Sequence, residues 1–207
     1  MYRILILIII IAFGGWIFWL VKNKRIENKS IGDAYHSFLT LIKFKDDNLL
    51  KSLRIISYQL MLISFALLAL TAFLPILFLG GHLSGFPLIL HVTVAPVFCV
   101  TLALTAVFWA HSQRLFSSDW PNLKNKIVQR ICSLEDGIAS WQKIYFWLFL
   151  LVSIPAILSI VLGMYPLFGT EGQATLIVIH RYTTLVLFFV AILHTLGLMV
   201  VTEKSNN

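Results

Sequence analysis

The sequence has few cysteines and few charged residues, and each shortage excludes a class of protein. Its two cysteines are Cys99 and Cys132, and neither belongs to a Cys-x-x-Cys-His sequence. This excludes a covalently attached c-type haem and an iron–sulfur cluster held by cysteines. Charged residues make up 12% of the chain, whereas soluble domains contain about 25%. The composition therefore argues against a soluble globular domain.

Long apolar runs are what the sequence has in abundance. Hydrophobic residues make up 59% of the chain, and a membrane-spanning helix needs about 20 consecutive, mainly apolar residues. The segments that satisfy this requirement are residues 2–21, 55–80, 86–110, 141–164 and 175–201. We therefore predict an all-α integral membrane protein with five transmembrane helices. We expect the first segment to be retained rather than cleaved as a secretory signal, because no small-residue cleavage site follows it.

The basic residues are distributed unevenly, and their distribution predicts the orientation. Of the 16 Lys and Arg residues, eight lie between the first two segments, five between the third segment and the start of the fourth, and one in the C-terminal tail. Cytoplasmic loops carry the excess of basic residues. We therefore predict a multi-pass protein of a prokaryotic cytoplasmic (inner) membrane, with its N-terminus outside and its C-terminus inside. The net charge of +7 then reflects this asymmetry and does not indicate a nucleic-acid partner.

The same pattern predicts how the chain is divided. Residues 1–21 form an N-terminal transmembrane helix, and residues 22–54 form a cytoplasmic or interfacial segment in contact with membrane lipid. Residues 55–201 form a four-helix membrane domain, and residues 202–207 form a cytoplasmic tail.

Histidine is the residue type in the predicted spans that could bind a cofactor. No Asp, Glu or Lys lies deep within them, although pathways for ions and protons usually contain such residues. His180 and His194 are 14 residues apart, which places them on one helix face with a rise of about 21 Å. Each imidazole could then ligate a different haem iron. The alternative is an accidental pair of buried histidines.

A third histidine, His91, is expected to face His180. Each lies five residues inside the outer start of its predicted segment, so the two are predicted to have the same depth. Two imidazole ligands give a low-spin haem b suited to electron transfer. We expect His111 to be interfacial, because it lies about 200° around the helix from His91. His36 and His82 are expected to be solvated.

His194 has no histidine opposite it at the cytoplasmic end of the spans. Met61 lies at a similar predicted depth in the second segment, and it could ligate a second haem of raised potential. Alternatively, Met61 is a packing residue, since methionine often fills gaps between helices.

Four stretches of the sequence resemble a known family. They are Ile89-Leu90-His91, Trp109-Ala110-His111, Gln142-Lys143-Ile144-Tyr145-Phe146-Trp147, and Ile179-His180 followed by thirteen residues and His194. In this order they resemble the cytochrome b subunit of respiratory formate dehydrogenases and membrane-bound nickel–iron hydrogenases, over about residues 54–201.

The resemblance implies a four-helix bundle that holds two b haems, with the helix of residues 2–21 as an addition. The outer haem ligands would be His91 and His180. The inner ligands would be His194 and a histidine at the position where this chain has Ser57, so we expect one haem, with a second possible. The implied binding residues for a quinone such as menaquinone are Ser140, Gln142, Lys143 and His194.

We therefore expect a membrane cytochrome b that transfers electrons between the quinone pool of a respiratory chain and an outer-face redox partner. An iron–sulfur or multihaem cytochrome subunit would be that partner, and this chain would be the quinone-reactive subunit of an oxidoreductase complex. The alternative is a haem-poor membrane anchor that docks a redox subunit and has no quinone site.

Overall fold

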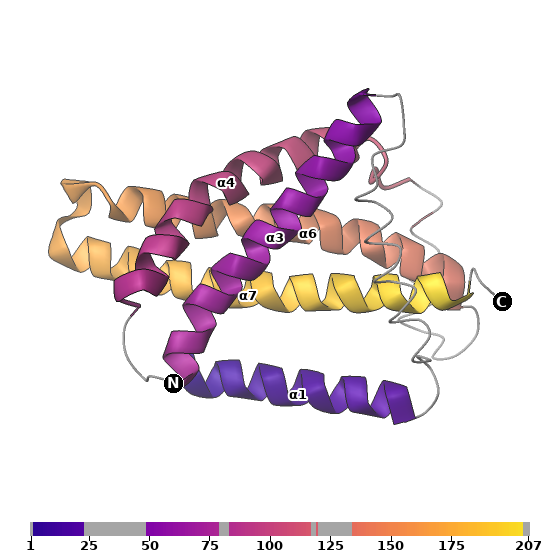
Figure 1. Cartoon of the computed structure of the whole chain (residues 1–207), viewed down its shortest axis with the longest axis horizontal. Coiled ribbons are helices and arrows are strands. Elements are labelled where there is room, and N and C mark those ends of the chain that lie inside the picture. Colours follow the sequence, from indigo (N-terminus) through magenta and orange to yellow (C-terminus); the bar gives the residue numbers. More distant parts are fainter. Residues whose placement is uncertain (1, 23–48, 79–82, 117–118, 120–133, 205–207) are drawn as a thin grey trace. The chain divides into compact units, whose positions relative to one another are not determined.

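The structure is a computed structural model, and its description covers residues 2–22, 49–78, 83–116, 119 and 134–204. Within these residues every regular element is helical, as predicted from the sequence. The elements are α1 (Tyr2–Lys22), α3 (Leu49–Phe78), α4 (Gly85–Ala110), α6 (Leu134–Gly163), the 3-10 turn η1 (Pro166–Phe168) and α7 (Gly169–Lys204) (Figure 1).

The protein is a multi-pass membrane protein with four candidate spans. The candidate spans in the described part of the chain are Leu49–Phe78, Gly85–Ala110, Ser140–Gly163 and Pro166–Thr195. They correspond to four of the five segments predicted from the sequence. The first predicted segment forms helix α1, and its crossing of the membrane remains a prediction, as does the orientation of the chain.

Three helices begin several residues earlier than the apolar runs predicted, and one of them is α6, which begins at Leu134 instead of residue 141. Helix α3 begins at Leu49 instead of residue 55, and α7 begins at Gly169 instead of residue 175. Backbone hydrogen bonding does not have to stop at the edge of the hydrocarbon layer, so a helix can extend into the interface. Glu171 in the first turn of α7 is favourable there because the positive end of the helix dipole attracts a carboxylate.

The chain forms two compact units, Met1–Ser112 and Gln113–Asn207, and each is described by itself. In the first unit α3 packs against α4, and α1 contacts α3. In the second unit α6 lies along α7 (Figure 1). The division of the chain predicted from the sequence remains a prediction.

Both helix pairs are antiparallel, as shown by side chains that meet at opposite ends. In the first unit the ring of Tyr58 lies 5.6 Å from that of Trp109, and the ring of Phe65 lies 5.8 Å from that of Phe98.

The prolines Pro75, Pro96 and Pro155 lie inside α3, α4 and α6. Proline interrupts one backbone hydrogen bond, which neighbouring helices can compensate in a membrane protein.

The distribution of buried and exposed residues suits a lipid surrounding. Large apolar side chains such as Leu70, Val107 and Leu151 are exposed, and hydrocarbon accepts them without the cost that water imposes. The buried positions include many small polar residues, namely Ser57, Ser64, Thr101, Thr105, Ser153 and Ser159. Small residues at helix contacts let two membrane helices approach closely.

Candidate functional site

His180 is held in one tautomer by a contact between α7 and α6. Its Nδ1 atom lies 2.8 Å from the main-chain oxygen of Ala156. A carbonyl oxygen can only accept, so Nδ1 carries the proton and donates it. In the neutral ring Nε2 is then the nitrogen with the lone pair. This is the arrangement that a histidine needs in order to ligate a metal through Nε2.

His91 is held in the same way by a contact between α4 and α3. Its Nδ1 atom lies 3.0 Å from the hydroxyl oxygen of Thr71. That hydroxyl also lies within donor distance of the carbonyl oxygens of Leu67 and Leu68, at 2.7 and 3.1 Å. When it donates its one proton to either of them, it accepts a hydrogen bond from the Nδ1–H of His91, and Nε2 of His91 then carries the lone pair.

The two expected haem ligands lie in different units, so their pairing remains a prediction. His91 belongs to Met1–Ser112 and His180 to Gln113–Asn207. The two histidines were predicted to have equal depth because each lies five residues after the start of its apolar run. The beginning of α7 at Gly169 does not test that count, because a helix can extend beyond the hydrocarbon layer. The matched depth consequently needs experimental evidence of its own.

His194 and Gln142 meet through the main chain. Gln142 is buried and its Nε2 atom donates to the carbonyl oxygen of His194 over 3.1 Å. Oε1 of Gln142 and Nδ1 of His194 are both buried and have no hydrogen-bond partner among the described residues. Such groups usually have a partner. The α6–α7 contact therefore offers two polar atoms to a further hydrogen-bonding group.

His180 and His194 lie along the same stripe of α7, as their spacing predicted. Leu187 is seven residues from each and is 3% exposed. His180 contacts Ala156 on α6, and the carbonyl of His194 contacts Gln142 on the same helix. Their difference is chemical, because Nδ1 of His180 has an acceptor, whereas Nδ1 of His194 has none among the described residues.

Ser57 and Met61 lie on the buried side of α3. Their exposed fractions are 4% and 7%, and residues four apart occupy one helix face. The Ser57 hydroxyl donates to the carbonyl oxygen of Arg54 over 3.0 Å, so it is engaged within its own helix. Burial of Met61 fits both readings given by the sequence, a haem ligand and a packing residue.

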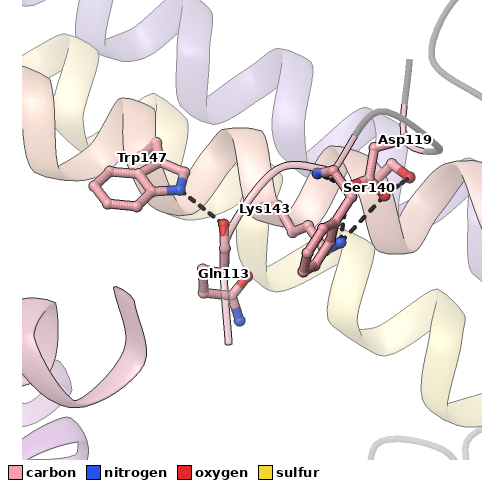
Figure 2. Close-up of polar contacts among 6 residues, drawn as sticks. Gln113, Asp119, Ser140, Lys143 and Trp147 are labelled. Carbon is pink, nitrogen blue, oxygen red and sulfur yellow. Dashed lines mark hydrogen bonds and ion pairs between the residues drawn. The ribbon is translucent and has the colours of Figure 1, made fainter. Parts of the chain in front are cut away.

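Ser140 and Lys143, two of the expected quinone-binding residues, converge on a carboxylate that the sequence did not single out. Asp119 accepts hydrogen bonds from the Ser140 hydroxyl at 2.9 Å and from Lys143 Nζ at 2.9 and 3.1 Å. The N–H of Phe116 donates to the same carboxylate over 2.8 Å. Figure 2 shows these side chains directed toward one another. Gln142, by contrast, contacts α7, so the four expected quinone-binding residues form two groups.

The carboxylate of Asp119 is stabilised in its charged form. The hydrogen bond from the Phe116 N–H, followed by that from Lys143, holds the pKa of Asp119 below its ordinary value. Hydrogen bonds to a charged carboxylate favour ionisation. Trp147 supports the same region, because its Nε1 donates to the carbonyl oxygen of Gln113 over 2.8 Å (Figure 2). The main chain at Gln113 is thereby attached to α6.

Three further candidates complete the account of the expected histidines. His111 follows the last residue of α4 and is exposed, which agrees with an interfacial position. His36 and His82 lie outside the described residues.

The residues that sequence reasoning missed are partners of the expected ones. Thr71 and Asp119 are distant in sequence from His91 and Lys143 and belong to no motif with them. A faint signal existed for Asp119, since an acidic residue within a basic connection invites an ion pair. No comparable signal existed for Thr71, because threonine is common in membrane helices.

Comparison of the chain with protein-family models, with curated protein sequences and with solved structures gives no match. The likeness to the cytochrome b subunits thus rests on the sequence stretches named above, and any function must be argued from the residues themselves.

Proposed function

We propose that this protein is a membrane cytochrome b that transfers electrons between the quinone pool and a redox partner on the outer face of a prokaryotic inner membrane. The observation that carries the proposal is the shared state of His91 and His180. Each has Nδ1 within hydrogen-bond distance of an oxygen on the neighbouring helix, and metal-ligating histidines almost always donate to such an oxygen. With the proton on Nδ1, Nε2 is the basic nitrogen that each ring offers to a metal.

The chemistry of the two histidines suits haem b as the cofactor. His91 and His180 would supply the two neutral imidazole ligands of a low-spin iron. When bound, haem b supplies the one-electron chemistry, and the protein orients it and sets its environment. Thr71 and the Ala156 carbonyl oxygen would fix the two imidazole rings and raise their basicity.

The α6–α7 contact supports a quinone site. The amide nitrogen of Gln142 is engaged by the His194 carbonyl, so the amide presents Oε1, which is an acceptor. A quinol hydroxyl could donate to that oxygen. Nδ1 of His194 is a second buried polar atom. Ser140 and Lys143 would act through Asp119, by holding it against α6.

An iron–sulfur or multihaem subunit on the outer face would complete the electron path, as the likeness to the cytochrome b subunits implies. This chain would then be the quinone-reactive subunit of an oxidoreductase complex. The rival function is a haem-poor membrane anchor without a quinone site. It is favoured by Ser57, which stands where the related subunits have a haem ligand.

A reduced-minus-oxidised absorption spectrum of the purified protein tests the proposal. A low-spin b-type signal in at least one-to-one ratio with the protein is expected. A protein that contains no haem after expression in a haem-sufficient host would contradict the proposal and would favour the anchor.

A further inference from the structure

A group of hydrogen-bond donors in the first unit has no assigned role. Arg54 on α3 lies with its guanidinium carbon 4.0 Å from the centre of the Trp109 ring on α4. Nη2 of Arg54 donates to the hydroxyl of Ser112 over 3.1 Å. Nε of Arg54 and Nε1 of Trp109 are both buried and have no hydrogen-bond partner among the described residues. Two N–H donors from stacked side chains thus have no acceptor in the part of the chain that the structure describes.

Thr105 adds a third donor on the same face of α4. It lies four residues before Trp109, so it is one helical turn away on that face. Its side chain is 2% exposed, and its hydroxyl has no partner in the described part of the chain. Other threonines of this helix behave differently: Thr93 and Thr101 donate to the carbonyl oxygen four residues earlier. The Thr105 hydroxyl is therefore turned away from the usual acceptor of a helical threonine.

The charge of Arg54 also has no compensating carboxylate within ion-pair distance among the described residues. Arg54 lies inside a candidate span. A partly buried cation is costly unless an anion accompanies it. Guanidinium binds phosphate and carboxylate groups especially well, because its donors match their oxygens. The missing partner should therefore be an oxyanion.

We propose that Arg54, Trp109 and Thr105 form a binding site for an oxyanion at the end of the α3–α4 pair. The phosphate group of a membrane phospholipid would accept from Arg54 and Trp109. An ester carbonyl of the same lipid, which lies deeper than the phosphate, would accept from Thr105. A haem propionate offers similar oxygens, and the experiment distinguishes the two sources.

Full-length protein, purified in detergent and stripped of lipid, is titrated with phosphatidylglycerol, and native mass spectrometry measures the bound lipid. One lipid should bind more tightly than the rest. Arg54→Gln should weaken that binding about tenfold or more, because a charge-assisted contact is lost. Trp109→Phe and Thr105→Val each remove one donor and leave the packing nearly unchanged, so each should weaken it about threefold to tenfold.

Arg114→Gln is the matched control, because Arg114 is an exposed arginine outside the site, and it should leave the tight lipid unaffected. The haem-to-protein ratio and the haem midpoint potential are measured on the same preparations. A change in these values in Arg54→Gln and Trp109→Phe, with lipid affinity unchanged, supports the oxyanion site with a propionate as its source.

The proposal is overturned if lipid affinity and haem properties are unchanged in all three variants. It is equally overturned if Arg114→Gln lowers lipid affinity as much as Arg54→Gln, because the effect is then one of net charge. The lipid measurement does not depend on the proposed electron-transfer function. Absence of haem from the unaltered protein would contradict that function and would leave the lipid test of this site intact.

Discussion

Nδ1 of His180 donates a hydrogen bond to the main-chain oxygen of Ala156 over 2.8 Å, and this contact fixes which ring nitrogen is basic. Nδ1 of His91 lies 3.0 Å from the hydroxyl oxygen of Thr71, which gives the same result when that hydroxyl donates to Leu67 within α3. His194 has no such acceptor among the described residues. Since histidine ligands of metals nearly always have one, the three histidines are not equivalent. The following predictions use that difference.

Replacing either expected haem ligand should remove a low-spin b-type signal. His91→Ala and His180→Ala each delete one of the two proposed axial ligands, and one remaining imidazole does not give a six-coordinate iron. The reduced-minus-oxidised spectrum of each purified variant measures the loss. His111→Ala is the control, because His111 is exposed after the end of α4. If either His91→Ala or His180→Ala keeps the full signal, the pairing is wrong.

Thr71 should matter for haem binding although it would not touch the iron. Thr71→Val removes the acceptor for Nδ1 of His91 and keeps a side chain of similar shape. Loss of such an outer partner typically lowers metal affinity roughly ten- to a hundredfold. Haem titration of the apoprotein measures the effect. Thr93→Val provides the comparison, since Thr93 is exposed and donates only within its helix. Equal haem affinity in the two variants would contradict the role of Thr71.

The helices were predictable because lipid imposes a strict rule on sequence. A span must be apolar for about 20 residues, and four such runs reappear as candidate spans. The starts of α3 and α7 were not predictable from apolarity, because Leu49 and Gly169 lie in polar surroundings where a helix can still continue. That shift leaves the equal depth predicted for His91 and His180 untested.

The orientation is testable with accessibility tags. Fourteen of the 16 basic residues lie on one predicted side: eight in residues 22–54, five in residues 111–143 and one in the C-terminal tail. That side should be cytoplasmic. Tags at the N-terminus and at Gly169 should be accessible from outside the cell. A tag at Asn125, which lies outside the described residues, should be inaccessible. Outside labelling at Asn125 would invalidate the predicted orientation.

Asp119 should make the stability of the folded protein depend on pH. Its folded pKa lies below the ordinary value of 3.8, so the carboxylate stabilises the protein above about pH 4. This contribution is lost as the pH falls through the folded pKa. Asp119→Asn should lower the stability on the order of 1 kcal/mol at pH 7, and the difference should shrink near pH 3.

Thermal unfolding in detergent at both pH values measures the effect of Asp119. Glu171→Gln serves as the control, because Glu171 is an exposed carboxylate in the first turn of α7. A difference between unaltered protein and Asp119→Asn that stays constant from pH 7 to pH 3 would show that ionisation of Asp119 is not its cause.

The site was only partly predictable, because the sequence reveals candidate ligand residues but not the residues that hydrogen-bond to them. The histidines were visible because polar residues in spans are rare and costly. Asp119, 24 residues before Lys143, and Thr71, 20 residues before His91, become partners only when helices pack. Ser140 and Lys143 lie on a different face of α6 from Gln142, and a linear motif does not show which face each residue occupies.

The number of haems depends on the α3 position that lost its expected histidine. Ser57 is buried and its hydroxyl donates within the helix, and Nδ1 of His194 has no acceptor in the described part of the chain. Both facts favour one haem per chain, with His194 bonded to a quinone. A measured haem-to-protein ratio near one is therefore expected, and a ratio near two would contradict it.

Ser57→His tests the same position by restoring the ligand. If the helices retain the arrangement of the related subunits, the restored imidazole faces His194, and the ratio should rise from about one toward two, because two imidazoles suffice for a low-spin haem. Ala in place of Ser57 is the control and should leave the ratio unchanged. If the unaltered protein already holds two haems, Met61→Leu should remove the second, since leucine cannot ligate iron. Retention of both haems in Met61→Leu would exclude Met61 as the ligand and would require a donor from another residue.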